Sequence, residues 1–203
     1  MKKEIRSHFA SCLAGRKSTG KSTFTNKCAI EFYKAHPNKR VLIIDVNGSP
    51  AYNEHQLISY DQIKRWNKGI KKFYDPDHEK MFQFIIDFFS IRNNPRGFDG
   101  LILMEDCTKY IDATPDKQMK TFLVDHRMWR ADLIFTFHSI DIIPKFFWKM
   151  VNYVEIFKTQ DVFEGRDREL SRRIPNYKDV LKVHEKVMKH KSDYYHESVR
   201  TLI

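Results

Sequence analysis

The chain has 203 residues, enough for one domain with a sizeable hydrophobic core. Its 41% hydrophobic content, with seven glycines and seven prolines, is typical of a globular protein and excludes a fibrous or low-complexity chain. The 36 Lys and Arg against 26 Asp and Glu give a net charge of +10, which favours acidic partners such as nucleic acid or anionic lipid.

The cysteines and the N-terminus bear on the compartment. Cys12, Cys28 and Cys107 are odd in number and lack metal-ligand spacing, so they are typical of reduced thiols rather than of disulfides or zinc ligands. The N-terminus lacks the apolar segment of a secretory signal, and no apolar run approaches the roughly 20 residues that span a bilayer. We therefore expect a soluble, cytoplasmic protein without a transmembrane segment.

The first part of the chain alternates apolar runs with helical patterns. The apolar run 8–14 ends in a glycine-containing loop, and the pattern from 21 to 35 predicts a helix that stops at His36-Pro37-Asn38. The β-branched run 40–46 predicts a strand that is covered on both faces. The basic stretch 51–77 gives no clear element.

The rest of the chain continues the alternation. Helices are predicted at about 78–92, 116–129, 141–149, 162–173 and 176–190, and strands at 100–104, 131–137, 153–158 and 194–199. Such alternation implies an α/β fold with three layers, in which helices flank a mostly parallel central sheet. We expect one domain over 1–203, with its core at about 8–160 and C-terminal helices and a strand over 161–203.

A phosphate-binding pattern follows the first predicted strand. Gly15-Arg16-Lys17-Ser18-Thr19-Gly20-Lys21-Ser22 fits G-x-x-x-x-G-K-[ST] at every fixed position. In such a P-loop the backbone N–H groups point at the β-phosphate, and the next helix directs its N-terminal N–H groups at the same anion. The pattern predicts that residues 15–23, ending at Thr23, bind ATP. In this site Lys21 contacts the β- and γ-phosphates, and the Ser22 hydroxyl is a ligand of Mg²⁺.

Two acids end the strand predicted at 101–104. The side chains of Glu105 and Asp106 leave the strand on opposite faces, so they can serve different roles. We assign Glu105 to the magnesium ion and Asp106 to the attacking water, although the division is open. Asp45 is a competing candidate, because it also lies at the carboxyl end of a strand.

A polar residue and two arginines flank the strand predicted at 131–137. His138 ends this strand and would sense ATP against ADP beside the γ-phosphate. Arg127 and Arg130 lie just before the strand, where in a ring of subunits an arginine would reach a neighbour's γ-phosphate as a finger. A solvated helix end is the alternative interpretation of both arginines.

Together, the P-loop, the strand ending in two acids and the His-Arg helix before a strand with a polar end resemble the FtsK–HerA superfamily of P-loop motor ATPases. The chain is similar to genome-packaging ATPases of tailless, membrane-containing viruses and to the ATPase domain of zonula occludens toxin-like filamentous phage assembly proteins. The resemblance covers roughly residues 8–160. It implies a hexameric ring that moves double-stranded DNA into a procapsid, in the host cytoplasm or on the virion, with a portal vertex or capsid protein as a further partner.

The resemblance also implies roles for single residues. Lys21 and Ser22 would contact phosphate and metal, His138 would be the sensor, and Arg127 is favoured over Arg130 as the finger. The acidic pair departs from the family, which usually has Asp before Glu, and the sensor is often Gln rather than His. The phage assembly branch typically carries a membrane-spanning segment, whose absence favours packaging.

Other functions and a DNA contact stay open. A cationic run interleaved with Trp66 and Phe73 is our candidate for DNA contact, with a solvated face as the alternative: Lys64, Arg65, Lys68, Lys71 and Lys72. A second candidate run is Lys182, Lys186, Lys189 and Lys191. The segment 161–173 would imitate the arginine-rich lid of a small-molecule or nucleotide kinase. A nucleotide-regulated switch without translocation is the third class.

Overall fold

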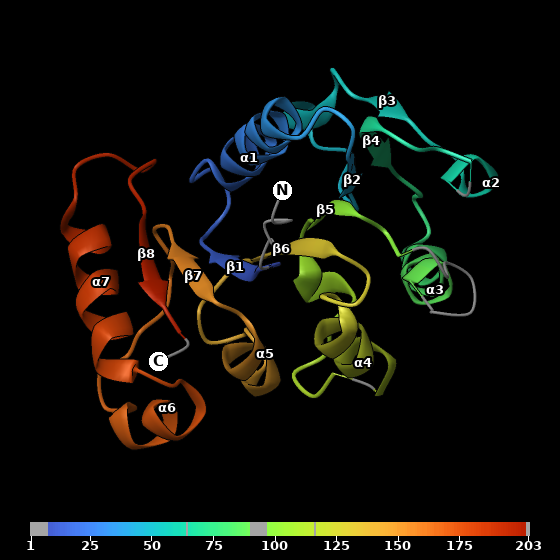
Figure 1. The fold of residues 1–203 in the computed structure, drawn as a ribbon. Coiled ribbons are helices and arrows are strands. Elements are labelled where there is room, and N and C mark those ends of the chain that lie inside the picture. The colour runs from blue at the N-terminus through green and yellow to red at the C-terminus, as the bar shows by residue number, and fades with distance from the viewer. Residues whose placement is uncertain (1–7, 64, 90–96, 116, 202–203) are drawn as a thin grey trace, which may run out of the picture.

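The computed structural model describes residues 8–63, 65–89, 97–115 and 117–201. Its strands form one sheet in the order β3-β4-β2-β5-β6-β1-β7-β8 (Figure 1). The strands are β1 (Ala10–Ala14), β2 (Arg40–Ile44), β3 (Gln56–Leu57), β4 (Gly69–Phe73), β5 (Gly100–Met104), β6 (Ala131–Phe137), β7 (Tyr153–Ile156) and β8 (Glu197–Arg200). All pairs are parallel except β7–β8, which is antiparallel.

Helices cover both faces of the sheet. The α-helices are α1 (Lys21–Ala35), α2 (Tyr60–Ile63), α3 (His78–Phe89), α4 (Lys117–Asp125), α5 (Lys145–Met150), α6 (Asp167–Arg173) and α7 (Tyr177–Lys189), and short 3₁₀ turns are η1 (Pro50–Tyr52) and η2 (Cys107–Lys109). Helix α1 packs against β2, β4 and β5 on one face, and α3, α4 and α5 lie on the other (Figure 1). The predicted α/β fold with three layers and a mostly parallel sheet is confirmed.

The hydrophobic residues divide between the two faces by the alternation of the strands. On β6, Leu133 and Phe135 belong to the larger cluster, which includes Phe147 and Trp148 of α5. Ile134 belongs to the smaller cluster on the α1 face. Because parallel strands point the same way, the carboxyl ends of β1, β2, β5 and β6 meet at one edge of the sheet, where the P-loop lies.

The structure differs from the predicted elements in several places. The stretch without a clear prediction contains β4, which adds to the sheet beside β2. Helix α4 ends at Asp125 instead of 129, because the chain turns back there and the Ala131 N–H donates to the His126 carbonyl at 2.9 Å. The end predicted for the helix at 78–92 lies outside the described residues.

Candidate nucleotide site

The P-loop connects β1 to α1 and is fixed from both sides. The Gly15 N–H donates to the Phe137 carbonyl at the end of β6 (3.2 Å), and the Arg16 N–H donates to the Lys158 carbonyl after β7 (2.8 Å). Gly20, the last residue before α1, has a φ of 87°, which glycine adopts without strain. These contacts hold the loop in a curve, with the start of α1 directed at its centre.

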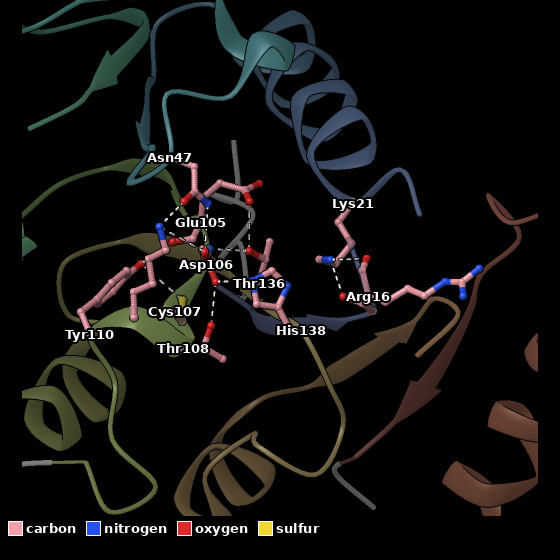
Figure 2. A network of polar contacts seen from close by, with 12 residues as sticks. Arg16, Lys21, Asn47, Glu105, Asp106, Cys107, Thr108, Tyr110, Thr136 and His138 are labelled. Atoms are coloured by element: carbon pink, nitrogen blue, oxygen red, sulfur yellow. Dashed lines mark hydrogen bonds and ion pairs between the residues drawn. The ribbon is translucent and has the colours of Figure 1, made fainter. Parts of the chain in front are cut away.

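The Lys21 side chain lies inside this curve. Its ammonium group donates to the carbonyls of Gly15 and Arg16, the latter at 2.9 Å (Figure 2). Burial lowers the pKa of Lys21, and the nearby charges of Glu105 and Asp106 oppose this shift. The result is a cation held at the point where the P-loop pattern requires contact with phosphate.

Glu105 is a buried acid of the site, with 5% of its surface exposed. Its carboxylate accepts hydrogen bonds from three hydroxyls, those of Thr25 (2.9 Å), Thr136 (3.1 Å) and Tyr52, and the Ser22 hydroxyl lies 3.5 Å away. Burial raises the pKa of Glu105, and the bonds from Tyr52, Thr25 and Thr136 oppose that rise. The carboxylate thus faces α1 and the P-loop hydroxyl.

Asp106 points a different way, because its φ of 48° turns the chain at the end of β5. Its carboxylate accepts from Asn47 (2.9 Å) and Thr108 (2.6 Å), and His138 Nε2 lies 2.8 Å from it (Figure 2). Burial raises the pKa of Asp106, but the bonds from Thr108 and Asn47 and the charges of His138 and Lys109 outweigh it, so the pKa is lowered. Asp106 is therefore an ionised acceptor at neutral pH.

His138 lies at the end of β6, with its side chain about one-third exposed. Burial lowers the pKa of His138, and the charge of Asp106 opposes this shift. The imidazole is therefore mostly neutral at neutral pH, and its Nε2–H donates to Asp106.

One cavity contains most of these groups. It is lined by P-loop residues 17–23, by 49–51 and by Asn47, Glu105, Asp106, Thr136 and His138. The residues come from β1–α1, β2, β5 and β6, which are far apart in sequence and meet only at this edge of the sheet. The structure thus brings the predicted phosphate loop, acid pair and sensor into one site.

The sequence itself matches no protein-family model and no curated protein. Among solved structures, the genome-packaging NTPase B204 of Sulfolobus turreted icosahedral virus 2, in complex with ATP-gammaS, is similar with a TM-score of 0.70 at 20% identity, over 96% of this chain and 92% of that chain. VirB4 of Thermoanaerobacter pseudethanolicus is similar with a TM-score of 0.64 at 8% identity, over 100% and 91%. The chain has a P-loop NTPase fold.

The predicted resemblance to viral genome-packaging ATPases is confirmed at the level of this P-loop NTPase fold. DNA-packaging B204 of Sulfolobus turreted icosahedral virus gives a TM-score of 0.68 at 18% identity, over 95% of this chain and 92% of that chain. The N-terminal domain of zonular occludens toxin from Neisseria meningitidis reaches 0.47 at 12% identity, over 76% and 79%, a likeness too low to bear on this chain. Among the described residues, no helix is both long and apolar enough to cross a membrane.

A P-loop NTPase fold implies a magnesium ion, and the residues present fit one. Mg²⁺ prefers hard oxygen ligands, and it commonly takes one or two protein oxygens together with phosphate and water. The Ser22 hydroxyl and the Glu105 carboxylate supply such oxygens, and both line the cavity beside the P-loop. Ser22 and Glu105 are thus the residues that would hold the ion.

Asp45, the competing acid, does not line this cavity. It is fully buried, and its Oδ2 atom lies 3.9 Å from the ammonium of Lys72 on β4. Burial raises the pKa of Asp45, while backbone bonds from Asn47 and Ser49 and the Lys72 charge oppose that rise. This pair corrects the prediction for Lys72, which is buried in the sheet and does not belong to an exposed cationic run.

The other members of that cationic run differ in their exposure to solvent. Arg65 and Lys68 are exposed, Lys71 is half-buried and donates to Gln56, and Lys64 lies outside the described residues. The cations of the second run, on and after α7, are all exposed.

Arg127 is exposed in the turn after α4 and precedes β6. It therefore lies at the amino end of that strand, across the sheet from the P-loop of its own chain. Arg130 is exposed in the same turn. A contact between either arginine and a γ-phosphate would need a second subunit.

Sequence reasoning did not identify several residues that hold the acids. Thr25 follows Lys21 by one helical turn, and Thr136 is a polar residue within the apolar strand β6, so both carried a detectable signal. Tyr52 and Asn47 come from the loop after β2. Their contacts with Glu105 and Asp106 depend on the pairing of distant strands, which no local pattern reveals.

Proposed function

We propose that this chain is a Mg²⁺-dependent ATPase. The observation that carries the proposal is that Lys21, at the start of α1, faces a buried acid pair across one cavity. The P-loop amides and Lys21 bind and orient the phosphates, and they stabilise the charge that develops during phosphoryl transfer. Ser22 and Glu105 would hold a magnesium ion, which would neutralise charge on the phosphate oxygens.

The division between the two acids follows from their neighbours. Glu105 approaches Ser22, the predicted metal ligand, which supports its role at the metal. Asp106 is ionised, belongs to the same edge and contacts His138, which supports its role as the acceptor that orients the attacking water. His138 then holds Asp106 in place and lies where it can respond to the γ-phosphate.

The experiment for hydrolysis is steady-state phosphate release from Mg-ATP by the wild type, Lys21→Ala and a matched control. Lys27→Ala removes a lysine from the exposed side of the same helix. We expect Lys21→Ala to lower hydrolysis at least 100-fold, in line with the loss of a charge that stabilises the transition state, and Lys27→Ala to stay near the wild type. Equal rates in all three proteins would contradict the proposal.

We further propose that ATP hydrolysis drives movement of double-stranded DNA during viral genome packaging, in a homo-oligomeric ring such as a hexamer. The support is the fold shared with packaging NTPases over nearly the whole chain, together with the net charge of +10. In this arrangement Arg127 acts on the site of a neighbouring subunit. The host cytoplasm is the proposed place of action.

The DNA contact is tested by charge reversal at Lys68 and Lys71. The double variant Lys68→Glu/Lys71→Glu should weaken DNA stimulation of hydrolysis and reduce its salt dependence, because fewer phosphates are neutralised. The control variant Lys145→Glu/Lys149→Glu makes the same charge change on the exposed side of α5. Unchanged stimulation in the first variant would refute this contact.

No observation favours a kinase lid. Within 161–173, Arg166 pairs with Asp141 (2.7 Å) and Glu169 (3.1 Å), and Arg173 donates to the Ile143 carbonyl. No residue of this segment, all of which the structure describes, lines the nucleotide cavity. The arginines that imitate a lid in the sequence are thus engaged elsewhere in the fold or lie outside the cavity.

A further inference from the structure

An exposed aromatic ring lies directly on the P-loop. Tyr194, in the loop between α7 and β8, has 70% of its surface exposed. A Cβ atom added to Gly20 would lie 2.9 Å from Cδ1 of this ring. The ring therefore rests against the backbone of the last P-loop residue before α1, and a larger residue at Gly20 would displace it.

The loop that carries Tyr194 is tied to the P-loop by charge. The Asp193 carboxylate lies 3.2 Å from Arg16 of the P-loop and 3.1 Å from Lys158, which follows β7. The bond and charge of Lys158, followed by those of Arg16, lower the pKa of Asp193, so the carboxylate is ionised at neutral pH. The Tyr194 N–H donates to the Ser192 hydroxyl at 3.2 Å, which shapes the loop locally.

The sheet order places this ring opposite the acids. Glu105 and Asp106 follow β5, and His138 follows β6, on one side of β1. Arg16 points away from these groups, toward the side of β7 and β8 from which Asp193 comes (Figure 2). If the γ-phosphate faces Asp106 and His138, a nucleotide that extends across the start of α1 places its base on the side of Tyr194.

We propose that Tyr194 is the stacking platform for the purine base of the bound nucleotide. The inference rests on the nucleotide site of the proposed function and adds the residue that contacts the base. A tyrosine ring offers a flat apolar face, and stacking of a base on such a face is favourable without any hydrogen bond to the base edges. The ion pairs of Asp193 hold the loop so that the ring stays beside Gly20.

The test separates the base from the phosphates. Calorimetric titration with Mg-ADP and with Mg-pyrophosphate is made on the wild type, Tyr194→Ala, Tyr194→Phe and Tyr153→Ala. We expect Tyr194→Ala to weaken ADP about 5- to 100-fold and to leave pyrophosphate within about 2-fold, because only ADP carries a base. Tyr194→Phe keeps the ring and should bind as the wild type does. Tyr153 is an exposed tyrosine on β7, and its removal should change neither affinity.

The outcomes distinguish this inference from the proposed function. Unchanged ADP affinity in Tyr194→Ala would overturn the base contact while leaving the phosphate site intact. An equal loss of ADP and pyrophosphate affinity would also overturn it, because the residue would then support the P-loop rather than the base. Failure of the wild type to bind either compound would overturn the nucleotide site itself and, with it, this assignment.

Discussion

Replacing Glu105 by glutamine should stabilise the protein while it slows ATP hydrolysis. The substitution keeps the shape of the side chain and removes one charge. In the structure this carboxylate is 5% exposed, and burial raises its pKa. Above its folded pKa, this group is therefore ionised in a position that disfavours the charge, a conflict that is typical of catalytic sites.

The size and pH dependence of the effect follow from this conflict. The three hydroxyls that donate to Glu105 can rotate to bond a glutamine amide, so the substitution leaves few unsatisfied groups. We expect a gain of about 1 kcal/mol at pH 8, which raises the Tm of a chain of this length by about 2–4 °C. The pKa of Glu105 is higher in the folded state than in the unfolded state. The stability of the wild type therefore falls as pH rises from the unfolded pKa through the folded pKa. The gain should therefore largely vanish near pH 4, where the carboxyl group is mostly protonated in both states.

Thermal unfolding at pH 4 and pH 8, with phosphate release from Mg-ATP, measures both effects. Glu164→Gln removes an exposed carboxylate and should change neither quantity. Hydrolysis by Glu105→Gln should fall at least 10-fold, because a group at the metal is lost. A lower Tm at pH 8, or hydrolysis equal to that of the wild type, would refute this account of Glu105.

Three further substitutions test other parts of the site. Tyr52→Phe removes a buried donor to Glu105 and should lower the free energy of unfolding by about 1–2 kcal/mol, measured by urea titration. It should also slow hydrolysis, measured by phosphate release. Unchanged stability would exclude the hydrogen bond. Gly15→Ala would place a Cβ atom 2.5 Å from Cβ of Phe157, so we expect a loss of about 1–3 kcal/mol in the same titration, and a neutral result would show that the loop yields. His138 has a folded pKa below its ordinary value, so wild-type stability is lost as pH falls through about 6.5. His138→Gln should reduce this loss of stability between pH 7.5 and 5.5. An equal fall in Tm between these two pH values in the wild type and the variant would contradict a lowered pKa for His138.

The parts of the molecule that sequence reasoning predicted are local patterns. The P-loop and the acids after β5 are contiguous, and their place at strand ends follows from the alternation of strands and helices. The bounds of α1 agree with the prediction, because apolar spacing and His36-Pro37 fix both ends.

The parts that were missed depend on distant partners. Strand β4 contains Lys71 and Lys72, which in sequence look like a basic surface, yet Lys72 is buried beside Asp45. Likewise, nothing near Tyr194 indicates that its ring lies on Gly20, 174 positions earlier in the chain.

The function proposed for this chain is movement of double-stranded DNA driven by ATP hydrolysis at the P-loop. The most direct single measurement is steady-state ATP hydrolysis at low salt, with and without double-stranded DNA, by assembled wild type and Lys21→Ala. We expect strong stimulation by DNA in the wild type and none in Lys21→Ala. Wild-type hydrolysis that DNA does not change, in protein shown to be assembled, would contradict the motor function.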